Sequence, residues 1–271
     1  MLRKLLITAA AIVFLISGGL VLRQELYRWQ AQRAYEQARS QADVSQQEQP
    51  PRPIPPEEPE IVQEPLAQQA QYLYRVDLAG LRSENPDVLG WIAIPGTQLD
   101  YPFLQGEDNQ YYLKHTWQGK KNAAGSVFLE CQVSPDFSDF NTIVYGHNMK
   151  NGSMFGSLRQ YRTQSHYEAN PSVYVVDDTG IRRYDVFAAF EAEVVGYTYR
   201  LDLNTPEKKQ AFLDYSLARS VIRTGIVPTV EDSVITLSTC TGNGYETRWV
   251  VQGVLTGTFT APEPSAPEAA H

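Results

Sequence analysis

The sequence predicts a mostly β fold, a closed eight-stranded barrel with helices at its periphery. Short segments rich in β-branched and aromatic residues recur from residue 88 onward, with turn-forming residues between them. Two segments with helical spacing interrupt this series, one before the first strand and one between the sixth and seventh strands. The first third of the 271-residue chain does not look globular, so we expect a single folded domain at residues 66–260.

The N-terminal segment is predicted to anchor the chain in a membrane. Arg3 and Lys4 lie in a short tail, residues 1–4, and the apolar run at 5–22 is just long enough to cross a bilayer as a helix. We interpret them as a cytoplasmic tail and a transmembrane signal anchor, with the lipid bilayer as a partner. The expected location is the cell membrane, as a single-pass protein with an extracellular domain. A cleaved signal peptide is the alternative, although no clear Ala-x-Ala site follows Leu22.

Residues 23–65 are predicted to form a stalk. The first part, up to about residue 48, is polar and rich in Gln and Ala, and is expected to continue as a helix. Residues 49–59 are rich in proline, which lacks the amide proton and favours an extended polyproline conformation. This stretch is typical of a semi-rigid spacer, with a ligand for a proline-recognising domain as the alternative.

Two helices are expected to flank the barrel. Residues 66–81 have Leu and Tyr at helical spacing, and an Asn-Pro pair stops this helix. Asn204 or Thr205 can cap a second helix, which begins with Pro206 and ends near residue 219.

The predicted strands alternate with turns along the rest of the domain. A turn that ends at Gly180 joins the fifth and sixth strands as a hairpin, because glycine tolerates the positive φ that such turns require. Residues 261–271 are expected to form a disordered tail. The eight strands are residues 88–94, 99–104, 125–130, 141–145, 172–177, 183–195, 233–239 and 247–260.

The composition argues against several functions. With 31 acidic and 23 basic residues the net charge is -8, and without a basic cluster we expect no nucleic-acid partner. The two cysteines, Cys131 and Cys240, are too few and too isolated for a zinc site, so no metal or other cofactor is expected. A disulfide between them would consume the one plausible nucleophile, and we interpret Cys131 as an unpaired structural residue.

Cys240 is the candidate nucleophile. It follows the β-branched run at 233–239, and the Thr-Gly-Asn-Gly turn after it leaves the thiol open to a substrate. A thiol with a pKa of about 8.5 is little ionised at neutral pH and needs a basic partner. His147 follows the strand-like run at 141–145, so two strand ends could bring imidazole and thiol together. Arg248 lies on the next segment, where strand pairing would return its guanidinium toward the sulfur.

These motifs resemble the sortases, and class B in particular. Thr-Leu-Ser-Thr-Cys at 236–240 is followed by an arginine, and Asn-Thr-Ile-Val-Tyr-Gly-His-Asn-Met occupies 141–149. The likeness covers about residues 66–260. Further matching stretches follow in the family's order at residues 90–97, 99–102, 105–106, 109–113, 125–129 and 152–158.

The resemblance implies a cysteine transpeptidase on a Gram-positive cell. The thiolate of Cys240 would attack a threonine carbonyl in a sorting signal of a secreted protein and form a thioester. An amine of a peptidoglycan precursor or cross-bridge would then take the acyl group. His147 would act as general acid and then as general base. Arg248 could stabilise the oxyanion, position the substrate or lower the thiol pKa.

The resemblance also implies a set of substrate-binding residues. A helix-bearing connection before the seventh strand forms one wall of the groove in class B. The residues that match groove positions are Asn109, Leu113, Tyr197, Tyr199, Ser238 and Thr239.

Three other functions stay open at this point. A pilin-polymerising sortase would use a lysine amine as acceptor. A cysteine peptidase would release its product to water, and a non-catalytic surface-binding barrel would keep the fold without the chemistry.

Overall fold

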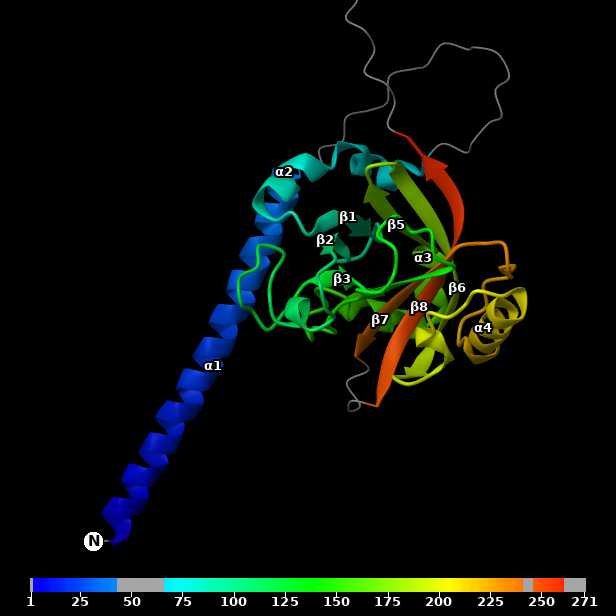
Figure 1. The fold of residues 1–271 in the computed structure, drawn as a ribbon. Helices are drawn as coiled ribbons and strands as arrows, with labels where there is room; N and C mark the ends of the chain where they lie inside the picture. Colours follow the sequence, from blue (N-terminus) through cyan, green and yellow to red (C-terminus); the bar gives the residue numbers. More distant parts are fainter. Residues whose placement is uncertain (1, 43–65, 241–245, 261–271) are drawn as a thin grey trace, which may run out of the picture.

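The computed structural model describes residues 2–42, 66–240 and 246–260. The proline-rich part of the predicted stalk, the turn after Cys240 and the predicted C-terminal tail lie outside the described residues. In the described part, a barrel of eight strands lies beside a long N-terminal helix (Figure 1). The predicted closed eight-stranded barrel is confirmed.

The strands agree closely with the predicted segments. The β5–β6 hairpin is tighter than predicted, because Asp177 pairs directly with Gly180, whose φ is 127°. The strands are β1 (Val88–Ala93), β2 (Asp100–Leu104), β3 (Val127–Leu129), β4 (Asn141–Tyr145), β5 (Ser172–Asp177), β6 (Gly180–Glu193), β7 (Val234–Cys240) and β8 (Thr247–Phe259).

The barrel is a mixed sheet with the order β1-β2-β3-β4-β7-β8-β6-β5. Two pairs are parallel, β2 with β3 and β4 with β7, and the other pairs are antiparallel. A parallel pair needs a crossover connection, so strands distant in sequence become neighbours. The order places β4, β7 and β8 side by side, and these are the strands that carry or precede the candidate catalytic residues.

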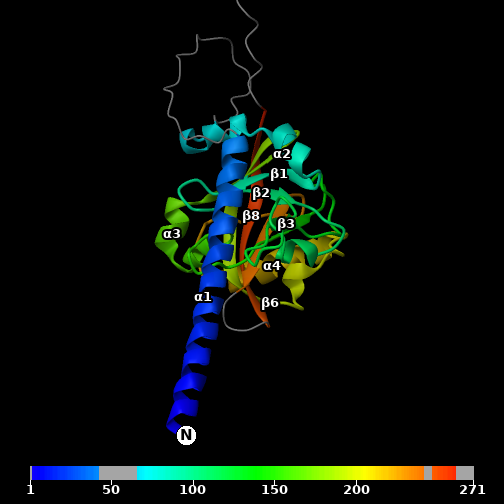
Figure 2. The same ribbon diagram turned by 90° about the vertical axis from the view of Figure 1, so that its left-hand side faces the viewer.

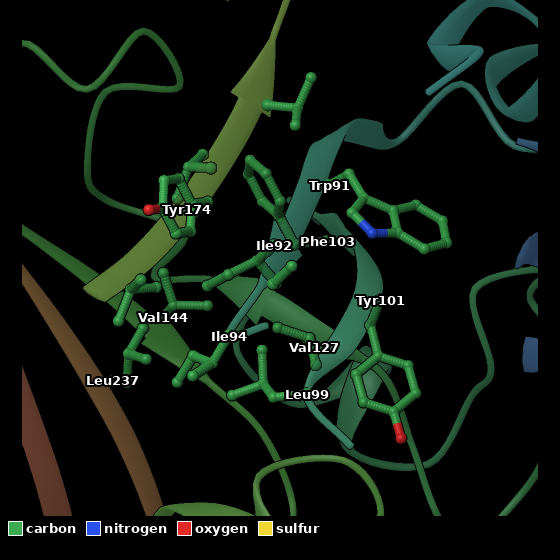
Figure 3. Close-up of a cluster of buried hydrophobic side chains, with 14 of the residues drawn as sticks. Trp91, Ile92, Ile94, Leu99, Tyr101, Phe103, Val127, Val144, Tyr174 and Leu237 are labelled. Carbon is green, nitrogen blue, oxygen red and sulfur yellow. The ribbon is translucent and has the colours of Figure 1, made fainter. Parts of the chain in front are cut away.

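The interior of the barrel is filled by aliphatic and aromatic side chains. Figure 3 shows part of this core, where Ile92 of β1 lies on the same side as Val144 of β4 and Leu237 of β7, with Phe103 of β2 nearby, while the indole of Trp91 points away from them. All five side chains are at most 1% exposed. Burial of one such side chain contributes roughly 1.5–3 kcal/mol, so the core fixes the register of the strands whose ends form the site.

A second apolar cluster holds α4 (Pro206–Arg219) on the outside of the barrel. Phe212 and Leu213 of α4 are fully buried in a cluster that includes Phe187 of β6 and Val250 of β8. The hydroxyl of Thr205 accepts a hydrogen bond from the amide of residue 208 at 3.4 Å and caps the helix, as predicted.

The first predicted flanking helix is divided in two. The structure has a 3-10 helix, η1 (Gln68–Arg75), followed by a separate α2 (Leu78–Glu84). The reason is Asp77, whose carboxylate accepts a hydrogen bond from the amide of Gly80 at 2.9 Å and starts a new helix. The remaining short elements are η2 (Tyr111–Leu113), η3 (Gly156–Arg162), α3 (Gln164–Ala169) and η4 (Tyr197–Tyr199).

The N-terminal helix, α1 (Leu2–Gln41), packs on the barrel through its C-terminal half. Figures 1 and 2 show this half against the barrel, while the N-terminal end extends beyond it. Ala34, Tyr35 and Ala38 are buried in the same cluster as the barrel core. The ring of Tyr35 meets Tyr101 of β2 edge to face, with 5.1 Å between centroids. This half of α1 is therefore part of the folded domain.

No helix in the described part of the chain is long and apolar enough to cross a membrane. The finding contradicts the predicted transmembrane anchor at 5–22 and the predicted single-pass location in the cell membrane.

Asp100 is a buried carboxylate where α1 meets the barrel. It accepts hydrogen bonds from Trp91 Nε1 at 2.7 Å and from the Tyr72 hydroxyl at 3.2 Å, and Arg39 lies 3.5 Å away. Burial raises the pKa of Asp100, and the Trp91 hydrogen bond and Arg39 offset this only in part. Its carboxyl group therefore keeps a proton at a higher pH in the folded state than in the unfolded state.

This raised pKa makes a prediction for stability. The contribution of Asp100 to the free energy of unfolding is fully present below the unfolded pKa of about 3.9 and is lost as the pH rises through the folded pKa. We expect wild type to lose stability relative to Asp100→Asn as the pH rises, measured by urea unfolding from about pH 4 to 7. A difference between the two proteins that stays constant with pH would contradict this.

Candidate active site

The three predicted catalytic residues lie at one end of the barrel. In the parallel β4–β7 pair, Tyr145 is opposite Ser238, and the amide of Gly146 still donates to the Ser238 carbonyl at 3.2 Å. His147 and Cys240 each come two residues after this pair, so both lie at this end of the β4–β7 pair. The antiparallel β7–β8 pair places Arg248 directly opposite Cys240. Figure 1 shows that β7 ends and β8 begins at the same edge of the barrel.

The backbone of Cys240 is set by this ladder, while its side chain lies outside what the structure describes. Arg248 is half-buried, and its Nη1 donates to the carbonyl of Thr247 at 2.9 Å. A guanidinium stays protonated at any working pH and offers five N–H donors. Because it lies opposite Cys240, it could stabilise negative charge that forms next to the predicted nucleophile.

His147 is oriented by a backbone carbonyl. Its Nε2 lies 2.8 Å from the carbonyl oxygen of Leu113, in the turn η2. A carbonyl oxygen only accepts hydrogen bonds, so we assign the proton of the neutral ring to Nε2. Nδ1 is then the nitrogen that can take up and give back a proton, with the ring plane held in place by Leu113.

Gly125 provides the space in which the His147 ring lies. Its φ is 58°, a region that favours glycine. A Cβ at this position would lie 2.6 Å from the Tyr112 carbonyl, 2.9 Å from the Leu113 carbonyl and 3.0 Å from Cδ2 of His147. A side chain here would therefore displace both the ring and the carbonyl that orients it. Apart from the glycine itself, nothing in the sequence indicated this role.

Three of the predicted substrate-binding residues belong to two hydrogen-bond systems that meet at the ring of Tyr145. The hydroxyl of Tyr199 lies 2.8 Å from Ser238 Oγ, and its ring stacks on Tyr145 with 6.5 Å between centroids. Asn109 donates to Glu130 Oε2 at 2.7 Å, and the Tyr145 hydroxyl donates to the same oxygen at 3.0 Å. Leu113 makes a separate contact, through its carbonyl, with Nε2 of His147.

Sequence reasoning missed Glu130 and Tyr145, which join these systems. Glu130 is 7% exposed and follows the apolar strand β3. A glutamate is almost never buried unless its oxygens are paired, so a lone acid at the end of a buried strand was an available signal.

The two other predicted residues lie apart from these contacts. Tyr197 is exposed and stacks on Tyr215 of α4 with 5.7 Å between centroids. Thr239 is 2% exposed, and its Oγ1 has no hydrogen-bond partner among the described residues. Side chains alternate along a strand, so Thr239 faces the opposite side of β7 from Ser238.

Cys131 is a free cysteine, as predicted. It is half-exposed, and its Sγ lies 3.4 Å from Glu130 Oε1. Burial and the neighbouring Glu130 raise the pKa of the Cys131 thiol. This environment opposes thiolate formation, so Cys131 is poorly suited to act as a nucleophile.

Comparison with known proteins gives the family. The sortase domain family matches residues 92–256. Sortase B of Listeria monocytogenes is 38% identical over 185 residues, covering 67% of this chain and 74% of the relative. The Staphylococcus aureus sortase B–substrate complex has 32% identity and a TM-score of 0.62, covering 66% of this chain and 83% of that chain. A sortase B complex with triglycine has 32% identity and a TM-score of 0.62, covering 66% of this chain and 84% of that chain.

These matches agree with the barrel topology and confirm the resemblance of the sequence motifs. The matched region contains β1 to β8 almost completely, together with the three predicted catalytic residues. The chain therefore belongs to the sortase family, within class B, and is a cysteine transpeptidase.

Proposed function

We propose that this transpeptidase cleaves a C-terminal sorting signal after threonine and carries the upstream protein as a thioester on Cys240. It then transfers that protein to an amine of a peptidoglycan precursor or cross-bridge. The observation that carries the proposal is the register of β4, β7 and β8, which aligns His147, Cys240 and Arg248 at one edge of the barrel. The orientation of His147 by the Leu113 carbonyl adds support.

The first half of the reaction breaks the peptide bond. Nδ1 of His147 takes the proton of the Cys240 thiol, and the thiolate attacks the threonine carbonyl carbon. Arg248 donates hydrogen bonds to the resulting oxyanion. The carbon–nitrogen bond breaks as Nδ1 returns the proton to the leaving nitrogen, which leaves the thioester.

The second half forms the new bond. The incoming amine attacks the thioester carbon and loses a proton to Nδ1 of His147. The carbon–sulfur bond then breaks, an amide forms, and the thiolate recovers its proton from the imidazolium. His147 thus acts once as acid and once as base in each half, while Nε2 keeps its hydrogen bond to Leu113 throughout.

The donor substrate is a peptide with Asn or Ser, then Pro, any residue, and Thr before the cleaved bond. The Staphylococcus aureus relative solved with a substrate supports a peptide partner. We propose that the groove is formed by Tyr199 and Ser238, which are hydrogen-bonded to each other, together with Asn109 and the side chain of Leu113. Tyr197 and the backbone of Thr239 complete the proposed set.

The acceptor is a primary amine. A relative solved with triglycine supports a peptide amine of the kind found in cell-wall cross-bridges. The proposed reaction uses no cofactor. His147 carries out every proton transfer, and Arg248 stabilises the negative charge of the oxyanion.

The test uses the full chain, since α1 belongs to the folded domain. The protein is incubated with an Asn-Pro-Gln-Thr peptide and read by mass spectrometry, alone and with triglycine, a diaminopimelate-containing peptide or a lysine-containing peptide. We expect an acyl adduct on Cys240 and a ligated product that depends on the amine. Hydrolysed product in the presence of every amine, with no ligated product, would indicate a peptidase. Ligation to the lysine peptide alone would indicate a pilin-type acceptor. The absence of any adduct would contradict the proposal.

A further inference from the structure

We propose that α1 positions the imidazole of His147, with Tyr35 as the positioning residue. The proposal rests on the catalytic role proposed above for His147. The connection runs through the segment between the start of η2 and the start of β3, residues 111–126, which we call the 111–126 loop. This loop lies between α1 and His147 and contacts both.

Two buried side chains of the loop are bound to the backbone of α1. Nε1 of Trp117 donates to the carbonyl of Ala34 at 2.8 Å, and Nδ2 of Asn122 donates to the carbonyl of Tyr27 at 2.8 Å. Trp117 is fully buried and Asn122 is 4% exposed. Buried donors of this kind are costly to leave unpaired, so they hold the loop against the helix.

Tyr35 makes the third connection, in which the donor belongs to α1 and the acceptor to the loop. Its hydroxyl donates to the carbonyl of Gly125 and lies 3.4 Å from Oγ of Ser126. Burial raises the pKa of Tyr35 far above its usual range, so the phenol stays a neutral donor. Its ring is fixed from behind by Tyr101 of β2. The hydroxyl therefore reaches Gly125 from a rigid base.

The far side of the loop holds His147. Gly125 packs on the ring, and the Leu113 carbonyl binds Nε2 at 2.8 Å. The amide of Ser126 donates to the Tyr112 carbonyl at 2.8 Å, which ties the two sides of the loop together. A shift of Gly125 is therefore transmitted to Leu113, and both shift the imidazole.

The Tyr35 hydroxyl is thus linked to the His147 ring through the backbone of Gly125. Removal of the hydroxyl takes away the donor that holds Gly125, while the packing of the aromatic ring is kept. The expected result is a ring that is present but less well placed for proton transfer. A displacement of about 1 Å can lower a rate constant by as much as about 10²-fold.

The kinetic test compares Tyr35→Phe with Tyr161→Phe in the full chain. Tyr161 is a matched control, because it is equally buried and its hydroxyl donates to a backbone carbonyl, that of Asn170, at 2.6 Å. Neither Tyr161 nor Asn170 belongs to the 111–126 loop. We expect Tyr35→Phe to lower kcat for ligation about tenfold with little change in KM, and Tyr161→Phe to leave kcat near wild type. Equal kcat values for the two folded variants would overturn the proposal.

A spectroscopic readout tests the same link without turnover. The ring nitrogens of His147 are observed by 15N NMR and assigned by comparison with His147→Gln. We expect the Nε2–H tautomer in wild type and a larger share of the Nδ1–H tautomer in Tyr35→Phe. Unchanged ring signals in Tyr35→Phe would overturn the proposal. If wild type ligates no peptide, the proposed function fails, whereas these signals still decide whether Tyr35 positions His147.

Discussion

Cys240→Ala is expected to abolish thioester formation and ligation. Alanine cannot form the acyl intermediate, and the remaining His147 and Arg248 have no nucleophile to assist. Loss of a nucleophile from a catalytic unit lowers kcat by roughly 10⁴-fold or more. Peptide binding should persist, because the proposed groove residues Tyr199 and Ser238 are unchanged and remain hydrogen-bonded.

The matched control for this variant is Cys131→Ala, since the chain has two cysteines. Both variants are incubated with the Asn-Pro-Gln-Thr peptide and triglycine, and the protein mass and ligated product are recorded. Cys131→Ala should form the adduct and the product at the wild-type rate, because the raised pKa of the Cys131 thiol makes it a poor nucleophile. Ligation that survives in Cys240→Ala would refute the proposed chemistry.

Gly125→Ala is expected to reduce both stability and activity. The positive φ costs an ordinary residue about 1–2 kcal/mol, and the new methyl group would overlap the carbonyls of Tyr112 and Leu113. Relief of this overlap must move the Leu113 carbonyl or the His147 ring, and either movement disturbs Nδ1. We expect kcat to fall about 10²-fold, beyond any loss explained by unfolding.

Gly225→Ala separates strain from displacement. Gly225 has a similar φ of 74°, but an added Cβ would meet no atom within 4 Å. This variant should lose about 1–2 kcal/mol of unfolding free energy and keep its kcat. Urea unfolding and ligation kinetics are measured on both variants at a temperature where both are folded. Equal kcat values would show that Gly125 does not serve the site.

The barrel, and the placement of the three predicted catalytic residues at the ends of neighbouring strands, could be predicted because their signals are local. Each strand is a short β-branched run with turn residues around it, as in the segment that ends at Cys240. His147 and Cys240 both follow such runs, so their approach needed only the assumption that the two strands are neighbours. The β4–β7 pairing confirms that assumption.

The supporting residues could not be predicted, because their roles arise from long-range contacts. Tyr35 and Gly125 are 90 positions apart, and no periodicity in either segment indicates that they meet. Glu130 joins Asn109 to Tyr145 only after three separate segments have come together. A choice between Tyr197 and Tyr199 likewise depends on the turn η4, which directs the Tyr199 hydroxyl to Ser238.

Two local predictions were wrong for local reasons. The single helix expected at 66–81 is divided because the Asp77 side chain caps a new start, which a hydrophobic pattern does not reveal. The apolar run at 5–22 was interpreted from its length and the basic residues before it, and the described part of α1 does not provide a membrane span.

The parallel β4–β7 pair also sets the order in which the protein can mature. Each of its residue pairs joins positions more than 90 residues apart, so the pair forms only after a large loop has closed. β7 also pairs with β8, which is almost the last part of the domain to be synthesised, so this second pairing forms late. A nascent or truncated chain that lacks β8 thus carries Cys240 without Arg248, so under the proposed mechanism we expect no acyl adduct on Cys240 before synthesis of the domain is complete.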